Sequence, residues 1–189
     1  MYETSDFRNG LKIEVEGSPF AIVYFQFVKP GKGTAFTRTK LKNLLTGAVI
    51  ERTFRTGEVV PPAPVEEQPM QFLYNNGGTF TFMNTETFEQ VEIDQVLLGD
   101  DAGFLMESLP VHVLFYKGRA VNITLPNFIE ARVVETEPAV KGNTSGNVMK
   151  AAKLETGATI NVPIFVQEGE LLKVDTREGG SYVSRINTK

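Results

Sequence analysis

Short runs of β-branched and aromatic residues, separated by turns rich in glycine and proline, recur along the whole sequence. Near its start, Leu11, Ile13 and Val15 alternate with charged residues, the period of two that is typical of a strand with one buried face. "GSP" at 17–19 is expected to turn the chain into a second strand, "AIVYFQFV". With three more short strands over 34–60, this segment predicts a small β-barrel. No segment has the period of a long amphipathic helix, so the sequence indicates an all-β protein.

Four of the ten prolines fall within "VVPPAPVEEQP", residues 59–69. Proline fixes φ and lacks the backbone N–H, so we interpret this segment as a stiff connector, neither a helix nor a central strand. It marks the boundary between two predicted domains, 1–64 and 65–127. A third domain is predicted over 128–189.

The second segment contains "NNGG" between two strand-like runs, a strong signal for a hairpin. Further strands are predicted in "FEQVEI" and "VHVLFYKGRAVNITLP", and a short helix in "GDDAGFLMESL" (99–109), with Asp100 or Asp101 as its N-cap. One helix between the third and fourth strands is typical of a five-stranded oligonucleotide/oligosaccharide-binding (OB) barrel. The third segment has similar strand density, in "FIEARVVET", "ATINVPIFV", "ELLKVDT" and "SYVSRI".

Composition excludes several classes of protein. The 189 residues include no cysteine, which excludes disulfides, thiolate catalysis and cysteine-bound metal. The N-terminus has no basic segment followed by an apolar one, and no apolar run approaches the roughly 18 residues of a spanning helix. We therefore expect a cytoplasmic protein with no membrane partner.

Charge is segregated along the chain. Residues 1–64 carry a net charge of +3, residues 65–127 carry −7 and residues 128–189 carry 0. No acidic residue lies between Gly17 and Ile50, a stretch that holds five cations: Lys29, Lys32, Arg38, Lys40 and Lys42. Such a patch attracts a phosphate backbone, and Arg38, Lys40 and Lys42 share one face of a predicted strand. The solvated face of a half-buried strand explains the same pattern about equally well.

A turn, "FVKPGKGTAF" (27–36), places Lys32 at its tip between Gly31 and Gly33, with Pro30 just before. Both glycines can reach φ > 0 at no steric cost, so the stretch predicts a tight turn between two strands. Taken alone, Lys32 is more simply a solvated turn residue than a functional one.

The sequence contains no residue pattern that predicts an enzyme. "GKGT" lacks the upstream glycine, the hydroxyl residue directly after lysine and the following helix of a phosphate-binding P-loop. Schiff-base chemistry at Lys32 would need burial or a nearby cation, and an exposed turn supplies neither. The single histidine, His112, lies in an apolar strand and is expected to be structural, and adjacent carboxylates would point to opposite faces of a strand. We predict neither an enzyme nor a metal site.

Eight stretches along the chain carry one family resemblance: "SDFRNGLKI", "FVKPGKGTAF", "ERTFRTGE", "PMQFLY", "ETFEQVEI", "ETEPAVKGNT", "KAAKLETGATINVPIFVQEGE" and "KVDTREGGSYVSR". With these stretches the sequence resembles bacterial elongation factor P, and the resemblance covers essentially the whole chain. The family signature in the third segment is present as Lys150, Ala152, Gly157, Val162 and Pro163.

The resemblance implies three small β-barrels in an L-shaped, tRNA-like arrangement: an N-terminal KOW/SH3-like barrel and two OB barrels. Family members bind the ribosome between the peptidyl and exit sites and promote peptide-bond formation on ribosomes stalled at consecutive prolines. By position, Lys32 is the lysine that reaches the acceptor end of the peptidyl-site tRNA. In many members a modifying enzyme extends this lysine covalently, and we expect no other cofactor.

The resemblance also implies contacts by the third segment. The loop with Gly142, Asn143 and Thr144 corresponds to one that approaches messenger RNA in the exit site, although the family commonly has Asp where this chain has Asn143. Tyr182 and Arg185 are candidates for contact with ribosomal RNA or tRNA, with packing and solvation as equal alternatives. We expect a monomer.

Two other binding functions stay open. A general single-strand nucleic-acid binder would also use such barrels, but the net charge of −7 over 65–127 argues against it. A paralogue of elongation factor P with another client is the second, and the intact turn and signature argue against that.

Overall fold

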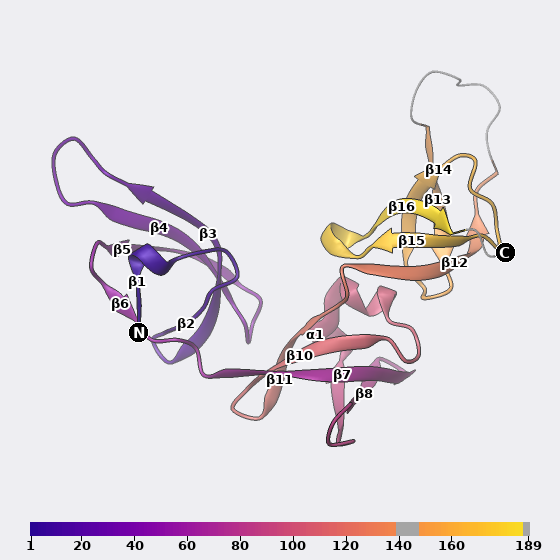
Figure 1. The fold of residues 1–189 in the computed structure, drawn as a ribbon, viewed down its shortest axis with the longest axis horizontal. Coiled ribbons are helices and arrows are strands. Elements are labelled where there is room, and N and C mark those ends of the chain that lie inside the picture. Colours follow the sequence, from indigo (N-terminus) through magenta and orange to yellow (C-terminus); the bar gives the residue numbers. More distant parts are fainter. Residues whose placement is uncertain (139–147, 187–189) are drawn as a thin grey trace. The chain divides into compact units, whose positions relative to one another are not determined.

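A computed structural model describes residues 1–138 and 148–186 of the chain. Nearly all regular elements are strands, and only one short α-helix occurs among these residues. The chain forms two compact units: residues 1–68 with 113–122, and residues 69–112 with 123–189 (Figure 1). The fold class is thus all-β, as predicted, whereas the division into domains at 64/65 and 127/128 stays a prediction.

The first sheet has four antiparallel strands in sequential order: β2 (Lys12–Val15), β3 (Ser18–Val28), β4 (Phe36–Asn43) and β5 (Val49–Arg55). A two-stranded ribbon accompanies it, β1 (Tyr2–Glu3) with β6 (Val59–Val60), and a 3₁₀ turn, η1, covers Thr4–Asp6. Leu11, Ile13 and Val15 are buried in its core, which confirms the alternation. The predicted turn is displaced, because Glu16 and Gly17 adopt positive φ and Ser18 already starts β3.

The core of this sheet is made of aromatic and aliphatic side chains from almost every element around it. Its buried members are Phe7, Leu11, Ile13, Val15, Phe20, Ile22, Leu41, Phe54 and Val60. Phe7 and Phe54 meet edge to face, with ring centroids 5.2 Å apart. Burial of this cluster fixes the base from which β3 and β4 extend as a long curved hairpin (Figure 1).

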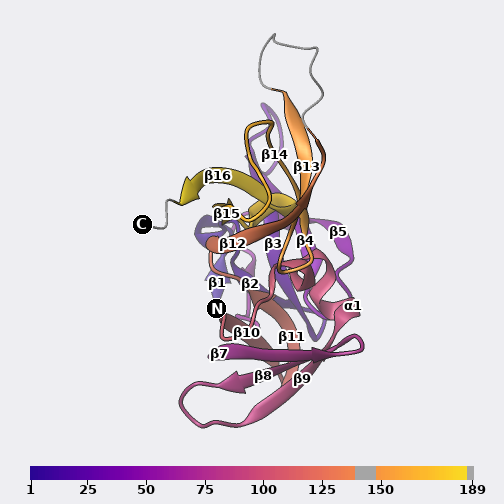
Figure 2. The same cartoon turned by 90° about the vertical axis from the view of Figure 1, so that its right-hand side faces the viewer.

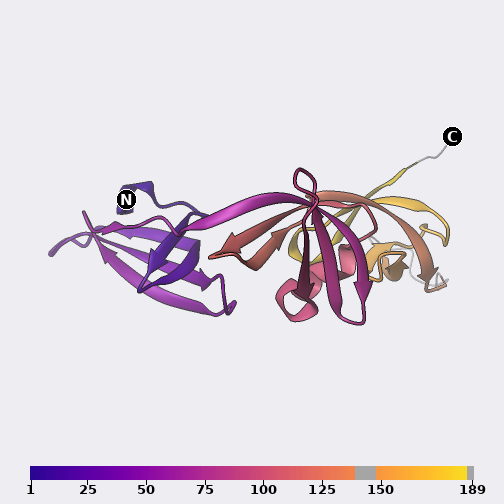
Figure 3. The same ribbon diagram turned by 90° about the horizontal axis from the view of Figure 1, so that it is seen from below.

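The second sheet has the strand order β11-β10-β7-β8-β9. Its strands are β7 (Val65–Asn76), β8 (Thr79–Asn84), β9 (Gln90–Asp94), β10 (Pro110–Tyr116) and β11 (Arg119–Thr124), and Figure 3 shows the length of β7. The "NNGG" hairpin is confirmed, because Asn76 pairs with Thr79 across Gly77 and Gly78, which both have positive φ.

The proline-rich segment is only partly a connector. Strand β7 begins at Val65 and is the central strand of its sheet, so the expectation that all of 59–69 lies outside central strands is wrong. Pro69 directly precedes Met70, where the pairing of β7 with β8 begins, and its carbonyl accepts hydrogen bonds from the backbone N–H of Thr85 (3.3 Å) and from the Thr85 hydroxyl (3.4 Å).

The predicted helix is displaced toward the N-terminus. The α-helix α1 covers only Gln95–Leu98, with Asp94 rather than Asp100 or Asp101 at its N-cap, and the 3₁₀ segment η2 follows over Gly99–Phe104. Gly99 ends α1 with φ 56°, a conformation that favours glycine. The position between the third and fourth strands of this sheet is as predicted.

The third sheet has the order β14-β13-β12-β15-β16. Its strands are β12 (Phe128–Thr136), β13 (Met149–Leu154), β14 (Thr159–Pro163), β15 (Leu171–Asp175) and β16 (Ser181–Ile186), with η3 over Arg177–Gly179. The end strands β14 and β16 also contact each other, so the sheet curls toward a closed barrel (Figure 2). Strand β13 was not predicted, since "MKAAKL" contains no β-branched residue.

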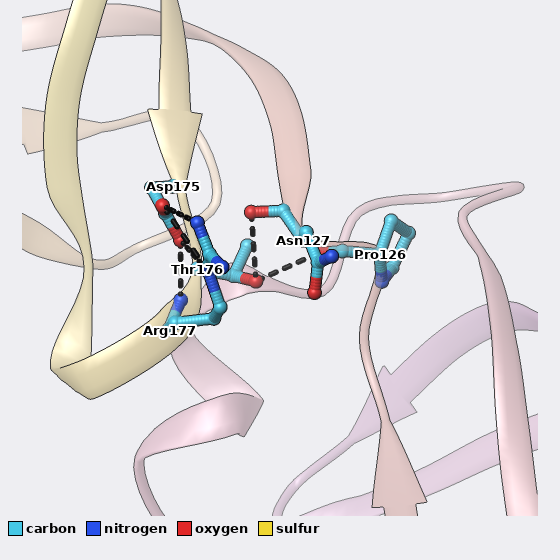
Figure 4. A network of polar contacts seen from close by, with 5 residues as sticks. All are labelled: Pro126, Asn127, Asp175, Thr176 and Arg177. Atoms are coloured by element: carbon cyan, nitrogen blue, oxygen red, sulfur yellow. Dashed lines mark hydrogen bonds and ion pairs between the residues drawn. The ribbon is translucent and has the colours of Figure 1, made fainter.

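A polar network holds the end of β15 (Figure 4). Asp175 accepts hydrogen bonds from the backbone N–H of Arg177 (3.0 Å) and its Nε (2.9 Å), and this partner lowers the pKa of Asp175 from 3.8 to about 2. The buried Thr176 hydroxyl donates to the carbonyl of Pro126 (2.7 Å), which ties β15 to the segment before β12.

Candidate nucleic-acid interface

Lys32 lies in a seven-residue loop, 29–35, between β3 and β4. Its side chain is exposed, and it forms no ion pair with any residue that the structure describes. The loop is longer than the predicted tight turn. Of its two glycines, only Gly33 adopts positive φ (110°), while Gly31 keeps an ordinary conformation and does not use the freedom that the sequence suggested.

Two contacts brace the loop. The Thr56 hydroxyl donates to the carbonyl of Ala35 (2.8 Å), and the Thr56 backbone N–H donates to the same oxygen (3.2 Å). Pro30 packs across the loop, with its Cγ 3.8 Å from the position that a Cβ on Gly33 would take. The base of the loop is thus fixed to the segment after β5, while Lys32 projects into solvent.

The basic residues of β4 lie as predicted. Arg38, Lys40 and Lys42 are exposed, whereas the alternating Thr37, Thr39 and Leu41 are buried, with at most 2% of each accessible. The register sets Arg38 opposite Gln26 of β3 and Lys40 opposite Tyr24. Lys29, at the start of the loop, is also exposed.

The charge of this stripe is partly balanced. The Lys40 ammonium lies 3.7 Å from Glu51, a weak exposed pair, and the Arg38 guanidinium lies over the Phe36 ring, 5.6 Å from its centroid. The ring restrains Arg38 without neutralising it. Arg38 therefore remains a cation that is held in place beside the Lys32 loop.

A recess of about 470 Å³ lies on the same face and was not predicted. Tyr24 and Gln26 of β3, Arg38 and Lys40 of β4, and Glu51 and Thr53 of β5 line it. The site could not be predicted from the sequence because a bulge at Val23 changes which β3 side chains face outward. Ile22 pairs with Leu41, and the next pair is Tyr24 with Lys40, so Val23 has no partner in the register.

The candidate residues of the third sheet lie in the other compact unit. Tyr182 is half-buried and meets Phe165 edge to face at 6.4 Å. Arg185 lies over the same ring, with its Cζ 4.8 Å from the centroid, and its Nη1 is 3.2 Å from Glu170. The structure thus brings Tyr182 and Arg185 together around Phe165. Gly142, Asn143 and Thr144 lie outside the described residues.

His112 is exposed on β10 between the buried Val111 and Val113, so it is a surface residue rather than a core one. Across residues 1–138 and 148–186, no three histidine, aspartate or glutamate side chains form a group that could hold a metal ion. In the same ranges no helix is long and apolar enough to cross a membrane.

The described folds define a class of all-β proteins that combine a KOW-like sheet with OB-type sheets. Residues 3–60 match the description "Elongation factor P (EF-P) KOW-like domain", residues 65–123 the EF-P OB domain and residues 121–185 "Elongation factor P, C-terminal". The archaeal structure titled eukaryotic translation initiation factor 5A from Methanococcus jannaschii has a similar fold (TM-score 0.50, 23% identity, 66% of this chain and 93% of that one).

Full-length relatives agree with these matches. Elongation factor P of Moorella thermoacetica is 52% identical over 98% of this chain and 100% of its own length. That of Symbiobacterium thermophilum is 50% identical over the same shares. The chain therefore belongs to the elongation factor P family of translation factors.

Proposed function

We propose that this translation factor binds the ribosome between the peptidyl and exit sites and promotes peptide-bond formation where consecutive prolines stall synthesis. The observation that carries the proposal is an exposed lysine on a braced loop beside a basic strand, in a chain of this family. By this proposal the three segments 1–64, 65–127 and 128–189 act as domains of a cytoplasmic monomer. Loop residues 142–144 face exit-site mRNA, and Tyr182 and Arg185 contact ribosomal RNA or tRNA.

The mechanism needs no bond-making group on the protein. Proline is a poor partner in peptide transfer, and holding peptidyl-tRNA in a reactive geometry can recover several kcal/mol of the barrier. Lys32 suits this role because its loop is fixed at Ala35 and its long cationic side chain is free to meet the tRNA acceptor end. Exposed Lys29, Arg38, Lys40 and Lys42 neutralise phosphates alongside.

The test compares translation of a proline-rich reporter with wild-type protein, Lys32→Ala and Lys117→Ala. Lys117 is an exposed lysine in another turn of the same compact unit. We expect Lys32→Ala to abolish rescue with an unchanged circular dichroism spectrum, and Lys117→Ala to be fully active. Normal rescue by folded Lys32→Ala protein would refute the proposal.

We also propose that a lysine-modifying enzyme extends Lys32. An exposed side chain on a projecting loop is accessible to such an enzyme. Peptide mass mapping of protein purified from its own cells should find added mass on Lys32 and on no other lysine. Unmodified Lys32 would show that the bare ammonium suffices.

A further inference from the structure

The recess on β3, β4 and β5 combines groups that serve different parts of one nucleotide. Its volume of about 470 Å³ lies within the range of small-ligand sites, roughly 300–1,000 Å³. Tyr24 is 45% exposed, although it belongs to a strand whose earlier residue Ile22 is fully buried. An exposed aromatic ring beside cations is the arrangement that stacks an unpaired base next to its phosphate.

The bulge at Val23 creates this arrangement. In an unbroken strand Tyr24 and Gln26 would share the face of Ile22 and point toward the core. The extra residue moves them to the outer face, opposite Lys40 and Arg38, and sends Phe25 and Phe27 to the inner side with Thr39 and Thr37. A bulge interrupts the ladder, and its effect here is to aim Tyr24 and Gln26 at the basic stripe.

The polar groups of the recess divide by chemistry. The Gln26 amide both donates and accepts, which suits the edge of a base, and the Thr53 hydroxyl does the same. Arg38, held over the Phe36 ring, offers a preorganised fork of donors for a phosphate. The carboxylate of Glu51 lies 3.7 Å from the Lys40 ammonium and repels a phosphate at that end, so the phosphate belongs on the Arg38 side.

We propose that this recess binds one unstacked ribonucleotide of the RNA that the Lys32 loop engages, with its base on Tyr24, its edge at Gln26 and its phosphate at Arg38. The proposal rests on the proposed function and adds to it a base-recognition site next to the lysine. It predicts that part of the RNA contact comes from stacking and base-edge hydrogen bonds and not from charge alone.

Nuclear magnetic resonance titration of the full chain tests the site directly. The probes are the four ribonucleoside 5′-monophosphates, with inorganic phosphate in parallel, and the readout is the amide shifts of Tyr24, Gln26 and Arg38. We expect saturable shifts with at least one nucleotide that phosphate alone does not produce. Stacking is worth about 1–3 kcal/mol per base, so Tyr24→Leu should weaken binding by about 5- to 140-fold.

The matched control is Phe27→Leu, which removes an exposed ring of the same strand from the opposite face. It should leave nucleotide affinity unchanged. Equal shifts with phosphate and nucleotides, no saturable shift, or equal losses for Phe27→Leu and Tyr24→Leu would each overturn the inference.

The reporter assay separates this site from the proposed function. Reduced rescue by Tyr24→Leu, with full rescue by Phe27→Leu, supports the recess. Full rescue by Tyr24→Leu while Lys32→Ala is inactive overturns the recess and leaves the function standing. If Lys32→Ala is also fully active, the function itself fails.

Discussion

Gly180→Ala should lower the free energy of local opening of the third sheet far more than the same change at the neighbouring Gly179. Both glycines have positive φ, 83° at Gly179 and 91° at Gly180, so alanine is strained at either by about 1–2 kcal/mol. Only Gly180 lacks room for a Cβ. Such an atom would lie 2.4 Å from Cζ and 2.8 Å from Cε1 of the buried Phe104, and nothing lies within 4 Å of the equivalent position on Gly179.

Of the two positions, only Gly180 adds a free-energy cost for a methyl group that does not fit. Forcing a methyl group into a packed site costs about 1–3 kcal/mol, which brings Gly180→Ala to about 2–5 kcal/mol in the free energy of local opening. At about 1.4 kcal/mol per tenfold, the extra overpacking cost makes amide exchange about 5- to 140-fold faster than in Gly179→Ala. Gly180 also has ψ of 133°, outside the left-handed helical region, so part of the difference comes from backbone strain, and the Phe104→Leu background isolates the packing term.

Hydrogen exchange with mass spectrometry measures both variants locally. Peptides from η2 and β16 should exchange faster in Gly180→Ala than in Gly179→Ala, while peptides from β2 to β5, which lie in the other compact unit, should not change. Adding Phe104→Leu removes the two clashing ring atoms and should recover part of the protection. Equal exchange in the two glycine variants would refute the packing argument.

Two further predictions concern titration and the loop. The Asp175 carboxylate has its pKa lowered by Arg177, so the stability difference between wild type and Asp175→Asn should be complete above about pH 4 and disappear as pH falls toward 2. A urea-midpoint difference that is constant from pH 6 to pH 2 would contradict this. Gly33→Ala should lower rescue of the proline-rich reporter by about five- to thirtyfold, since φ of 110° strains alanine by about 1–2 kcal/mol, and Gly31→Ala should not. Equal losses in the two variants would exclude a role for the Gly33 conformation.

The elements that the sequence predicted best are those in which local pattern and tertiary environment agree. The strand with Leu11, Ile13 and Val15 depends on one buried face, which the alternation of adjacent residues encodes. The turn at Gly77 and Gly78 depends on two positive φ values, which the two glycines themselves encode. The exposed face of Arg38 and its neighbours follows from the same alternation.

Sequence reasoning failed where long-range pairing overrides local preference. The sequence predicts Val65 to Pro69 as part of a connector, yet these residues begin β7, the central strand of its sheet. "MKAAKL" has low β-propensity, yet β13 pairs along both of its edges. In neither case do the residues next to the segment in the sequence indicate the strand with which it pairs.

The candidate site shows the same limit at the level of single side chains. Lys32 and the cations of β4 could be predicted, because they lie in a long stretch without acidic residues and the β4 cations occupy alternate positions of a strand. Tyr24 and Gln26 could not, because their direction depends on one extra residue, Val23, and the bulge is visible only once β3 is paired with β4. Deleting Val23 would keep every functional group and return Tyr24 and Gln26 to the inner face, so the recess is a property of strand register more than of residue identity.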